Sequence, residues 1–156
     1  MGLGIMRMSE KTPEQAAEII DTAYNSGINF IDSADIYGQG KSEEIFNAAL
    51  KLSHVKCEDL FIQSKIGIVF SPERSHGSRV FGSRYEFTKD HILAAVDGIL
   101  KRRDIAYLDS LLLHRPDALM DLNEVKEAFD ILQRSASQKA WDFNPEMNET
   151  SWQTAT

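Results

Sequence analysis

Four side chains that could donate, accept or stabilise a proton lie at or just beyond apolar segments of the sequence. Asp32 ends the segment NFID, Lys65 ends FIQSK and His114 ends LLLH. Tyr37 follows Asp32 in the stretch DSADIYGQG. A carboxylate, an ammonium, a phenol and an imidazole are complementary parts of a proton-transfer site. Such a site requires the fold to bring all four together.

Each of these side chains also has an ordinary structural interpretation when it is taken alone. Asp32 could be a loop or capping acid, and Lys65 could be a solvated strand terminus. Tyr37 could be a half-buried phenol, and His114 could be a hydrogen-bonded histidine beside a turn. No single residue therefore indicates a function.

The combination is more informative because each group supports another. A phenol titrates at about 10, too high for an efficient acid at neutral pH, but a neighbouring ammonium favours the phenolate. Lys65 could have this effect on Tyr37, and Asp32 could hold Lys65 by ion pairing. His114 could donate a hydrogen bond to a carbonyl oxygen as negative charge develops there.

The chain that must position these groups alternates short apolar segments with helical patterns. We expect strands in the segments GLGIM, INFID, LFIQSK and YLDSLLLH. Thr12 with Gln15 predicts a capped first helix, Ser42 opens a second, and Thr88 caps a third. Apolar residues at helical spacing predict the buried faces of these helices and of a fourth: Ala16, Ile20, Ala23 and Tyr24; Ile45, Phe46, Ala49 and Leu50; Ile92, Val96, Ile99 and Leu100; Val125, Ala128, Phe129 and Leu132.

Strands that alternate with helices predict an α/β fold with a parallel sheet covered by helices. Periodicity leaves two architectures open, the doubly wound open sheet and the closed barrel. In both, functional groups gather beyond the carboxyl ends of the strands. Asp32, Tyr37, Lys65 and His114 would then share one rim.

Length and charge limit the classes of protein. The chain has 156 residues, 42% of them hydrophobic, which fits one domain with a core of its own. Lys and Arg number 17 against 24 Asp and Glu, giving a net charge of -7. Because binding to phosphate backbones relies on basic surfaces, we expect no nucleic-acid partner.

We expect neither a membrane segment nor a leader. It lacks an apolar window of the roughly 18 residues needed to cross a bilayer, and its N-terminus lacks the apolar centre of a signal peptide. We therefore expect a cytoplasmic protein without a membrane partner. Cys57 is the one cysteine, so the chain offers neither a disulfide framework nor a cysteine metal site, and we expect no bound metal.

A series of motifs resembles the first half of the aldo-keto reductase family. These motifs occur in the family's order from about residue 2 to residue 134: GLGIMR, NFIDSADIYGQGKSEE, FIQSK, YEFTKDHILAAVDGILKR, YLDSLLLHRPD and EVKEAFDILQ. The resemblance implies a (β/α)8 barrel of the TIM type. Such a barrel takes about 250 residues, so four βα units make a truncated half of one.

The resemblance also implies a reaction and a set of roles. Asp32, Tyr37, Lys65 and His114 match the family's catalytic tetrad, with Tyr37 as the proton donor. Met6, Arg7 and Asp32 match positions that contact the cofactor. The implied reaction reduces a small-molecule aldehyde or ketone to an alcohol, with NADPH as the family's usual cofactor and NADH as the alternative.

Two other functions stay open at this stage. A half-barrel could be catalytically silent and act as a binding or assembly module. Lys65 could alternatively serve another kind of barrel enzyme by forming a Schiff base with its substrate. A half-barrel would also expose strand edges, so we expect the chain to associate with itself.

Two segments depart from the family's pattern. Residues 135–156, SASQKAWDFNPEMNETSWQTAT, do not match its fifth strand, so we interpret them as a divergent tail that is frame-shifted or disordered. Residues 67–87 form a long connection between the third predicted strand and the third predicted helix. Long loops are often functional, so this segment either shapes a substrate pocket or is a disordered insertion.

Overall fold

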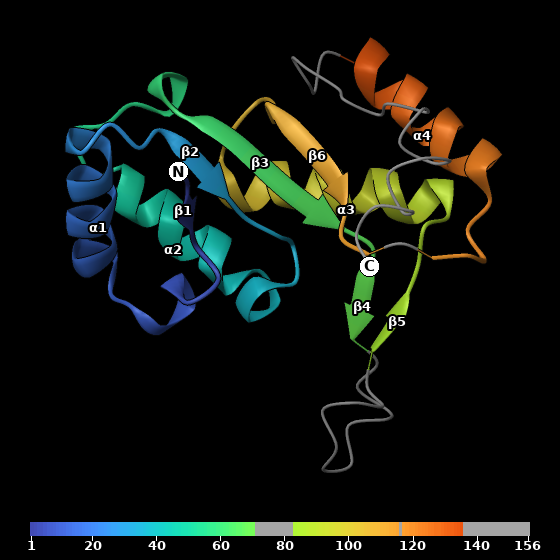
Figure 1. Cartoon of the computed structure of the whole chain (residues 1–156), viewed down its shortest axis with the longest axis horizontal. Helices are drawn as coiled ribbons and strands as arrows, with labels where there is room; N and C mark the ends of the chain where they lie inside the picture. The colour runs from blue at the N-terminus through green and yellow to red at the C-terminus, as the bar shows by residue number, and fades with distance from the viewer. Residues whose placement is uncertain (71–82, 116, 136–156) are drawn as a thin grey trace.

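Four parallel strands form the central sheet. The computed structural model describes residues 1–70, 83–115 and 117–135. Its sheet has the order β1 (Leu3–Gly4), β2 (Phe30–Asp32), β3 (Phe61–Ile66) and β6 (Ser110–Leu113), and all three strand pairs are parallel (Figure 1). The prediction of a parallel α/β sheet is confirmed.

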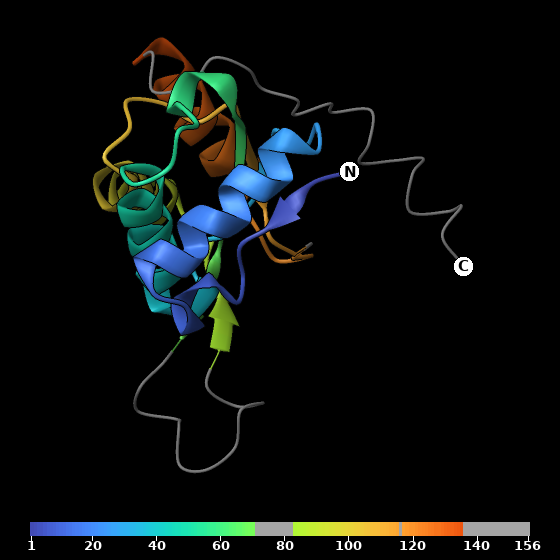
Figure 2. The same ribbon diagram turned by 90° about the vertical axis from the view of Figure 1, so that its left-hand side faces the viewer.

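In the described part of the chain, four helices alternate with the strands: α1 (Pro13–Asn25), α2 (Lys41–Leu50), α3 (Lys89–Arg103) and α4 (Leu122–Arg134). Consecutive helices contact one another, α1 with α2, α2 with α3 and α3 with α4. Figures 1 and 2 show α1, α2 and α3 gathered on one face of the sheet. Short 3-10 turns, η1 (Met8–Glu10), η2 (Tyr37–Gly40) and η3 (Cys57–Asp59), lie between the larger elements.

Two of the three predicted helix starts are confirmed. The Thr12 hydroxyl accepts a hydrogen bond from the Gln15 backbone N–H, and the Gln15 side chain accepts one from the Thr12 N–H. Thr88 likewise caps α3. The prediction that Ser42 opens the second helix is wrong, because α2 begins at Lys41 and Ser42 is a buried residue of its first turn.

The strands separate a packed face from an open one. Ile31, Ile62 and Leu111 are buried among the helices, at exposures of 1%, 2% and 4%. Their neighbours Phe61 and Leu112 point to the other side of the sheet and are 38% and 36% exposed. Since successive strand side chains alternate between faces, the core lies on the helix side, and no described element covers the opposite face.

The long connection after β3 begins and ends as a hairpin. Strands β4 (Ile68–Phe70) and β5 (Ser83–Tyr85) pair antiparallel directly beyond the carboxyl end of β3. In Figure 1 this hairpin projects away from the sheet. The stem is therefore ordered structure and not a simple loop, while residues 71–82 between its strands lie outside the described residues.

The predicted divergent tail also falls largely outside the description. Helix α4 ends at Arg134, and residues 136–156 are not among the described residues, so the tail stays a prediction. Within the described ranges, none of the helices combines the length and apolar character that a membrane crossing requires.

Candidate active site

The ammonium of Lys65 is the centre of the site. Its Nζ lies 2.6 Å from Asp32 Oδ1 and donates hydrogen bonds to the Ser33 carbonyl at 2.7 Å and to Tyr37 Oη at 3.3 Å. The side chain of Lys65 is 15% exposed and that of Asp32 is 34% exposed. The largely buried ammonium of Lys65 therefore lies between the carboxylate of Asp32 and the phenol of Tyr37, and this group of side chains is partly exposed to solvent.

Strand register explains why Asp32 and Lys65 meet. Asp32, the last residue of β2, is level with Gln63 in β3, and Lys65 follows Gln63 on the same face. Pairing with β3 continues beyond β2, since the backbone N–H groups of Ser33 and Asp35 donate to the carbonyls of Gln63 and Lys65, each at 3.0 Å. The chain leading to Tyr37 is thus attached to the strand that carries Lys65.

The turn η2 directs Tyr37 towards Lys65. Three consecutive residues of this turn, Gly38, Gln39 and Gly40, have left-handed φ angles of 58°, 56° and 88°. Glycine adopts this conformation readily, whereas glutamine is rarely found in it. The turn reverses the chain within a few residues, so α2 can begin directly behind Tyr37.

His114 approaches Tyr37 from the next strand. It follows β6, and its backbone N–H donates to the Ile66 carbonyl at 2.9 Å. The rings of His114 and Tyr37 lie edge to face, with centroids 6.0 Å apart and an interplanar angle of 81°. Burial, together with the charges of Lys65 and Arg115, holds the pKa of His114 below its usual 6.5. The imidazole is therefore mainly neutral at pH 7.

Comparison with known proteins decides the family. The model of the aldo/keto reductase family matches residues 1–141. The chain belongs to the aldo/keto reductase family. Among its relatives, the oxidoreductase YcsN of Bacillus subtilis is 40% identical over 136 residues, which are 85% of this chain and 44% of the relative. The 6-dehydroglucose reductase of Agrobacterium fabrum is 33% identical over 144 residues, 87% of this chain and 48% of the relative.

Solved aldo/keto reductases settle the architecture. The holo form of the reductase AKR11C1 from Bacillus halodurans superposes with a TM-score of 0.74 at 29% identity, covering 90% of this chain and 44% of that protein. The chain spans less than half the length of these relatives. The sheet is therefore half of a (β/α)8 barrel and not an open doubly wound sheet, which periodicity had left undecided.

The four tetrad residues predicted for this aldo/keto reductase chain lie together, but a fifth polar group was missed. The Gln63 side chain donates from Nε2 to Asp32 Oδ1 at 3.0 Å, so Asp32 accepts from both Gln63 and Lys65. Gln63 lies two residues before Lys65 in FIQSK. The two-residue period of a strand could have identified it, because that period places both side chains on one face.

Of the three residues predicted to contact a cofactor, Asp32 ends β2, whereas Met6 and Arg7 lie in the loop after β1. Ser42 Oγ donates a hydrogen bond to the Met6 carbonyl at 3.2 Å and accepts one from the Ser9 N–H at 3.3 Å. The Met6 side chain is 55% exposed, and Arg7 is also exposed. Ser42 thus connects this loop to the start of α2, directly behind the turn of Tyr37.

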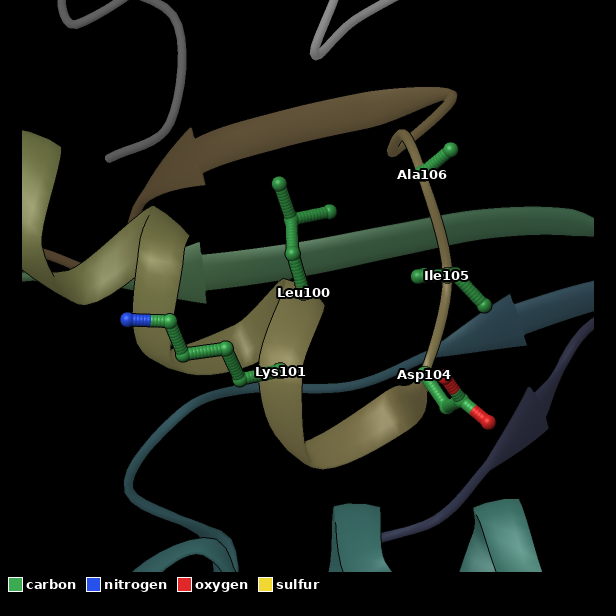
Figure 3. Close-up of a pocket in the computed structure, with 5 residues that line it drawn as sticks. All are labelled: Leu100, Lys101, Asp104, Ile105 and Ala106. Atoms are coloured by element: carbon green, nitrogen blue, oxygen red, sulfur yellow. The ribbon is translucent and has the colours of Figure 1, made fainter.

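A shallow surface depression lies away from this site. It is lined by Leu100, Lys101, Asp104, Ile105 and Ala106, at the end of α3 and in the segment leading to β6 (Figure 3). Because α3 runs opposite to the strands, its last residues lie near their amino ends. The depression and the tetrad are therefore at opposite ends of the sheet, and the depression has no part in the site.

Proposed function

We propose that this site reduces an aldehyde or ketone to an alcohol, with Tyr37 as the proton donor. The observation that carries the proposal is the position of Lys65 Nζ, 2.6 Å from Asp32 Oδ1 and 3.3 Å from Tyr37 Oη. When Tyr37 gives its proton to the substrate oxygen, a phenolate remains. The adjacent ammonium of Lys65 stabilises that negative charge, and Asp32 keeps the ammonium in place.

His114 would orient the substrate. A neutral imidazole has one N–H to donate, and a hydrogen bond to the substrate oxygen grows stronger as negative charge develops on that oxygen. The Nδ1 of His114 is buried and has no hydrogen-bond partner among the described residues. The lowered pKa of His114 favours this neutral form over a second cation beside Lys65.

Exposed groups at the rim support our proposal that the site holds a nicotinamide nucleotide. Asp32 keeps 34% of its side chain exposed although it is paired, and Met6 leaves an apolar surface open next to the turn of Tyr37. We assign Asp32, Met6 and Arg7 to holding the cofactor, as the family resemblance implies. When bound, the reduced nicotinamide supplies the hydride that the carbonyl carbon requires.

We propose NADPH as the preferred cofactor and a small-molecule carbonyl as the substrate. Fluorescence titration with NADPH and NADH tests the first choice in a barrel completed with the second half of a relative. We expect NADPH to bind more tightly, in keeping with the family's preference. Equal or tighter binding of NADH would contradict it.

The 156 residues alone are expected to be idle. Hydride transfer requires reacting atoms held about 3 to 3.5 Å apart, and orientation supplies a large part of the rate. By the family resemblance, most contacts to the cofactor's phosphates and adenine come from the second half of the barrel. Turnover by the purified chain that vanished on Tyr37→Phe would show that the half-barrel suffices.

A catalytically silent binding or assembly module is the second candidate. The open face of the sheet, with Phe61 and Leu112 more than one third exposed, favours it, because a partner could cover that face. A completed barrel that bound NADPH but reduced none of a broad set of aldehydes and ketones would support this candidate over a reductase.

Schiff-base chemistry at Lys65 fits the geometry less well. Its Nζ faces the Asp32 carboxylate, the Ser33 carbonyl and the Tyr37 hydroxyl, which is the environment of an ammonium with all three hydrogens engaged. A Schiff base requires a neutral amine with a free lone pair. Borohydride treatment with a carbonyl compound separates the two, since only an imine leaves a permanent adduct on Lys65.

A further inference from the structure

A buried ion cluster lies behind the tetrad and has no part in the proposed chemistry. The side chain of Glu43, in the first turn of α2, is fully buried. Its carboxylate lies 2.7 Å from Arg102 Nε and 3.3 Å from Arg103 Nε, both at the end of α3. The side chain of Arg102 is 29% exposed, whereas that of Arg103 is fully buried against the ring of Phe46.

Stability alone does not account for this cluster. Burying two opposite charges costs solvation energy that their attraction often fails to recover, and apolar residues of similar size are frequently as stable. Nη1 and Nη2 of Arg103 are buried without hydrogen-bond partners among the described residues, which adds to the cost. The role of the cluster is therefore better inferred from which elements it contacts than from its contribution to stability.

Arg102 extends from α3 to the turn that carries Tyr37. The Arg102 carbonyl is level with Asn47, whose side chain donates to it at 3.3 Å. From there the guanidinium reaches back along the helix, in the direction in which helical side chains tilt. It packs so closely on Gly40 that a Cβ there would lie 2.8 Å from Arg102 Cδ.

Contacts on the other side of the turn complete its enclosure. A Cβ on Gly38 would lie 2.6 Å from the Ser9 Cβ, and Ser42 ties Ser9 to the start of α2. The turn, including the uncommon left-handed Gln39, is thus held between Ser9 and Arg102. Such a conformation persists only when its surroundings enforce it.

We propose that Glu43 and Arg102 are positioning residues for Tyr37. Glu43 fixes the guanidinium of Arg102, and Arg102 holds the end of the turn Tyr37–Gly40, so that Tyr37 Oη stays against Lys65 Nζ. This inference rests on the proposed function, in which Tyr37 donates the proton. It assigns to two residues of the helix layer a role in the geometry of the site.

The test follows Tyr37 itself in the 156-residue chain. NMR of the chain labelled at the tyrosine ζ-carbon gives one signal per tyrosine, and Tyr37→Phe assigns the signal of Tyr37. In Arg102→Met we expect this signal to shift or split, and amide exchange of residues 37–42 to rise about tenfold while that of β3 stays unchanged. Arg102→Lys, which keeps the charge, should recover most of the native signal.

Two further variants keep the proposal falsifiable. Lys101→Met removes a neighbouring exposed charge from α3 and should leave the Tyr37 signal unchanged. Glu43→Gln keeps the shape of the side chain but weakens its hold on Arg102, so it should shift the signal in the same direction as Arg102→Met. If Arg102→Met does not fold, Glu43→Gln provides the same readout, with Arg102→Lys as the variant that should stay close to the native signal.

An unchanged Tyr37 signal in folded Arg102→Met or in Glu43→Gln would overturn the proposal, as would exchange that rose equally in β3 and in residues 37–42. Neither readout depends on turnover. A completed barrel that failed to reduce carbonyl compounds would contradict the proposed function, while a response of Tyr37 to Arg102→Met would still support the positioning role.

Discussion

At the scale of single residues, the account depends on the electrostatic position of Lys65. One ammonium contacts a carboxylate, a backbone carbonyl and a phenol, all within 3.3 Å. It also lowers the pKa of His114, although burial is the larger cause. The charge of Lys65 therefore influences the protonation of His114 without a hydrogen bond between the two side chains.

Removing this charge should change the titration of His114. In Lys65→Met, we expect the pKa of His114 to rise towards its usual value, because the repulsion between two cations disappears. The unpaired charge of Asp32, which raises this pKa, acts in the same direction. NMR of the His114 imidazole between about pH 5 and pH 8 measures the change.

Lys56, an exposed lysine that precedes β3 and lies away from the tetrad, provides the matched control for this titration. Lys56→Met removes an ammonium that is 72% exposed, near the amino end of β3. It should leave the pKa of His114 unchanged. A lower pKa of His114 in Lys65→Met, or an equal rise in both variants, would contradict the electrostatic role of Lys65.

The carboxyl of Asp35 makes stability depend on pH. Burial and the charge of Glu43 raise its pKa from 3.8 to about 6. The folded protein therefore holds this proton more tightly than the unfolded chain. The resulting stabilisation is present below pH 3.8 and is lost as the pH rises through 6.

Asp35→Asn should accordingly stabilise the protein at pH 7.5 by about 1 to 3 kcal/mol, since one pKa unit corresponds to about 1.4 kcal/mol. The gain should shrink as the pH falls towards 4, where Asp35 is protonated in the folded protein. Urea denaturation at several pH values measures it. The exposed Glu44→Gln should change stability by less than about 0.5 kcal/mol, and a gain from Asp35→Asn that did not vary with pH would refute the assignment.

At the scale of elements, the hairpin after β3 depends on a close approach of backbone to ring. Gly67 has a φ of 104°, and a Cβ there would lie 1.8 Å from Cε1 of Phe87. Phe87 is 5% exposed and has little room to move. The hairpin begins at the rim of the site, so the position of its stem there depends on this close contact.

Gly67→Ala should therefore destabilise the protein by about 1 to 3 kcal/mol or more, through both the clash and the strained φ. Gly4→Ala is the matched control, because a Cβ at Gly4 meets nothing within 4 Å, and it should cost less than about 0.5 kcal/mol. Denaturation midpoints in urea compare the two. Equal costs would show that the packing around Gly67 is not as close as described.

Local signals explain which elements could be predicted from the sequence. The Thr12 capping box and the apolar spacing of α4 depend on neighbours a few residues apart, and both predictions hold. Ser42 resembles a helix cap locally, but its partners are Ser9 and Met6, more than thirty residues away. The burial of Glu43 likewise depends on Arg102 and Arg103 of α3, so the sequence of α2 alone could not predict it.

In the candidate site, too, local patterns predicted some residues, whereas contacts between distant elements were not predictable from the sequence. The carboxyl-end rule for parallel strands placed Asp32, Lys65 and His114 on one rim without a structure. The turn around Tyr37 required more, because its left-handed residues are held by Ser9 and Arg102 from two other elements. The two-residue period of a strand could have predicted the position of Gln63 beside Lys65. No local pattern in the sequence could have predicted that Ser9 and Arg102 contact the turn.

At the scale of the whole molecule, the described residues leave one face of the sheet without a helix and two strands at its edges. The rings of Phe30 and Phe61 stack on that face with centroids 5.4 Å apart, and Leu112 is also exposed there. β1 and β6 are the edge strands. Exposed edges and apolar faces favour association with other chains.

We therefore expect the 156-residue chain to associate with itself as its concentration rises, as measured by sedimentation velocity. Phe61→Lys should weaken the association by placing a charge on the open face. Leu119→Lys changes a residue that is 92% exposed in the connection between β6 and α4 and should have no effect. A chain that stayed monomeric over a wide concentration range would contradict the expectation.

The central claim is that Tyr37 donates a proton in carbonyl reduction, and NADPH oxidation in the presence of a simple aldehyde tests it most directly. The protein to use is this chain joined to the second half of the Bacillus halodurans reductase, with and without Tyr37→Phe. The account predicts that Tyr37→Phe lowers kcat by about 100- to 10,000-fold, because it removes the general acid. The Kd for NADPH should change by less than about twofold, since a hydroxyl that acts only in the transition state contributes little to cofactor binding. Reduction by Tyr37→Phe within about threefold of the unmodified protein would contradict the account, because general-acid catalysis by Tyr37 would then contribute almost nothing.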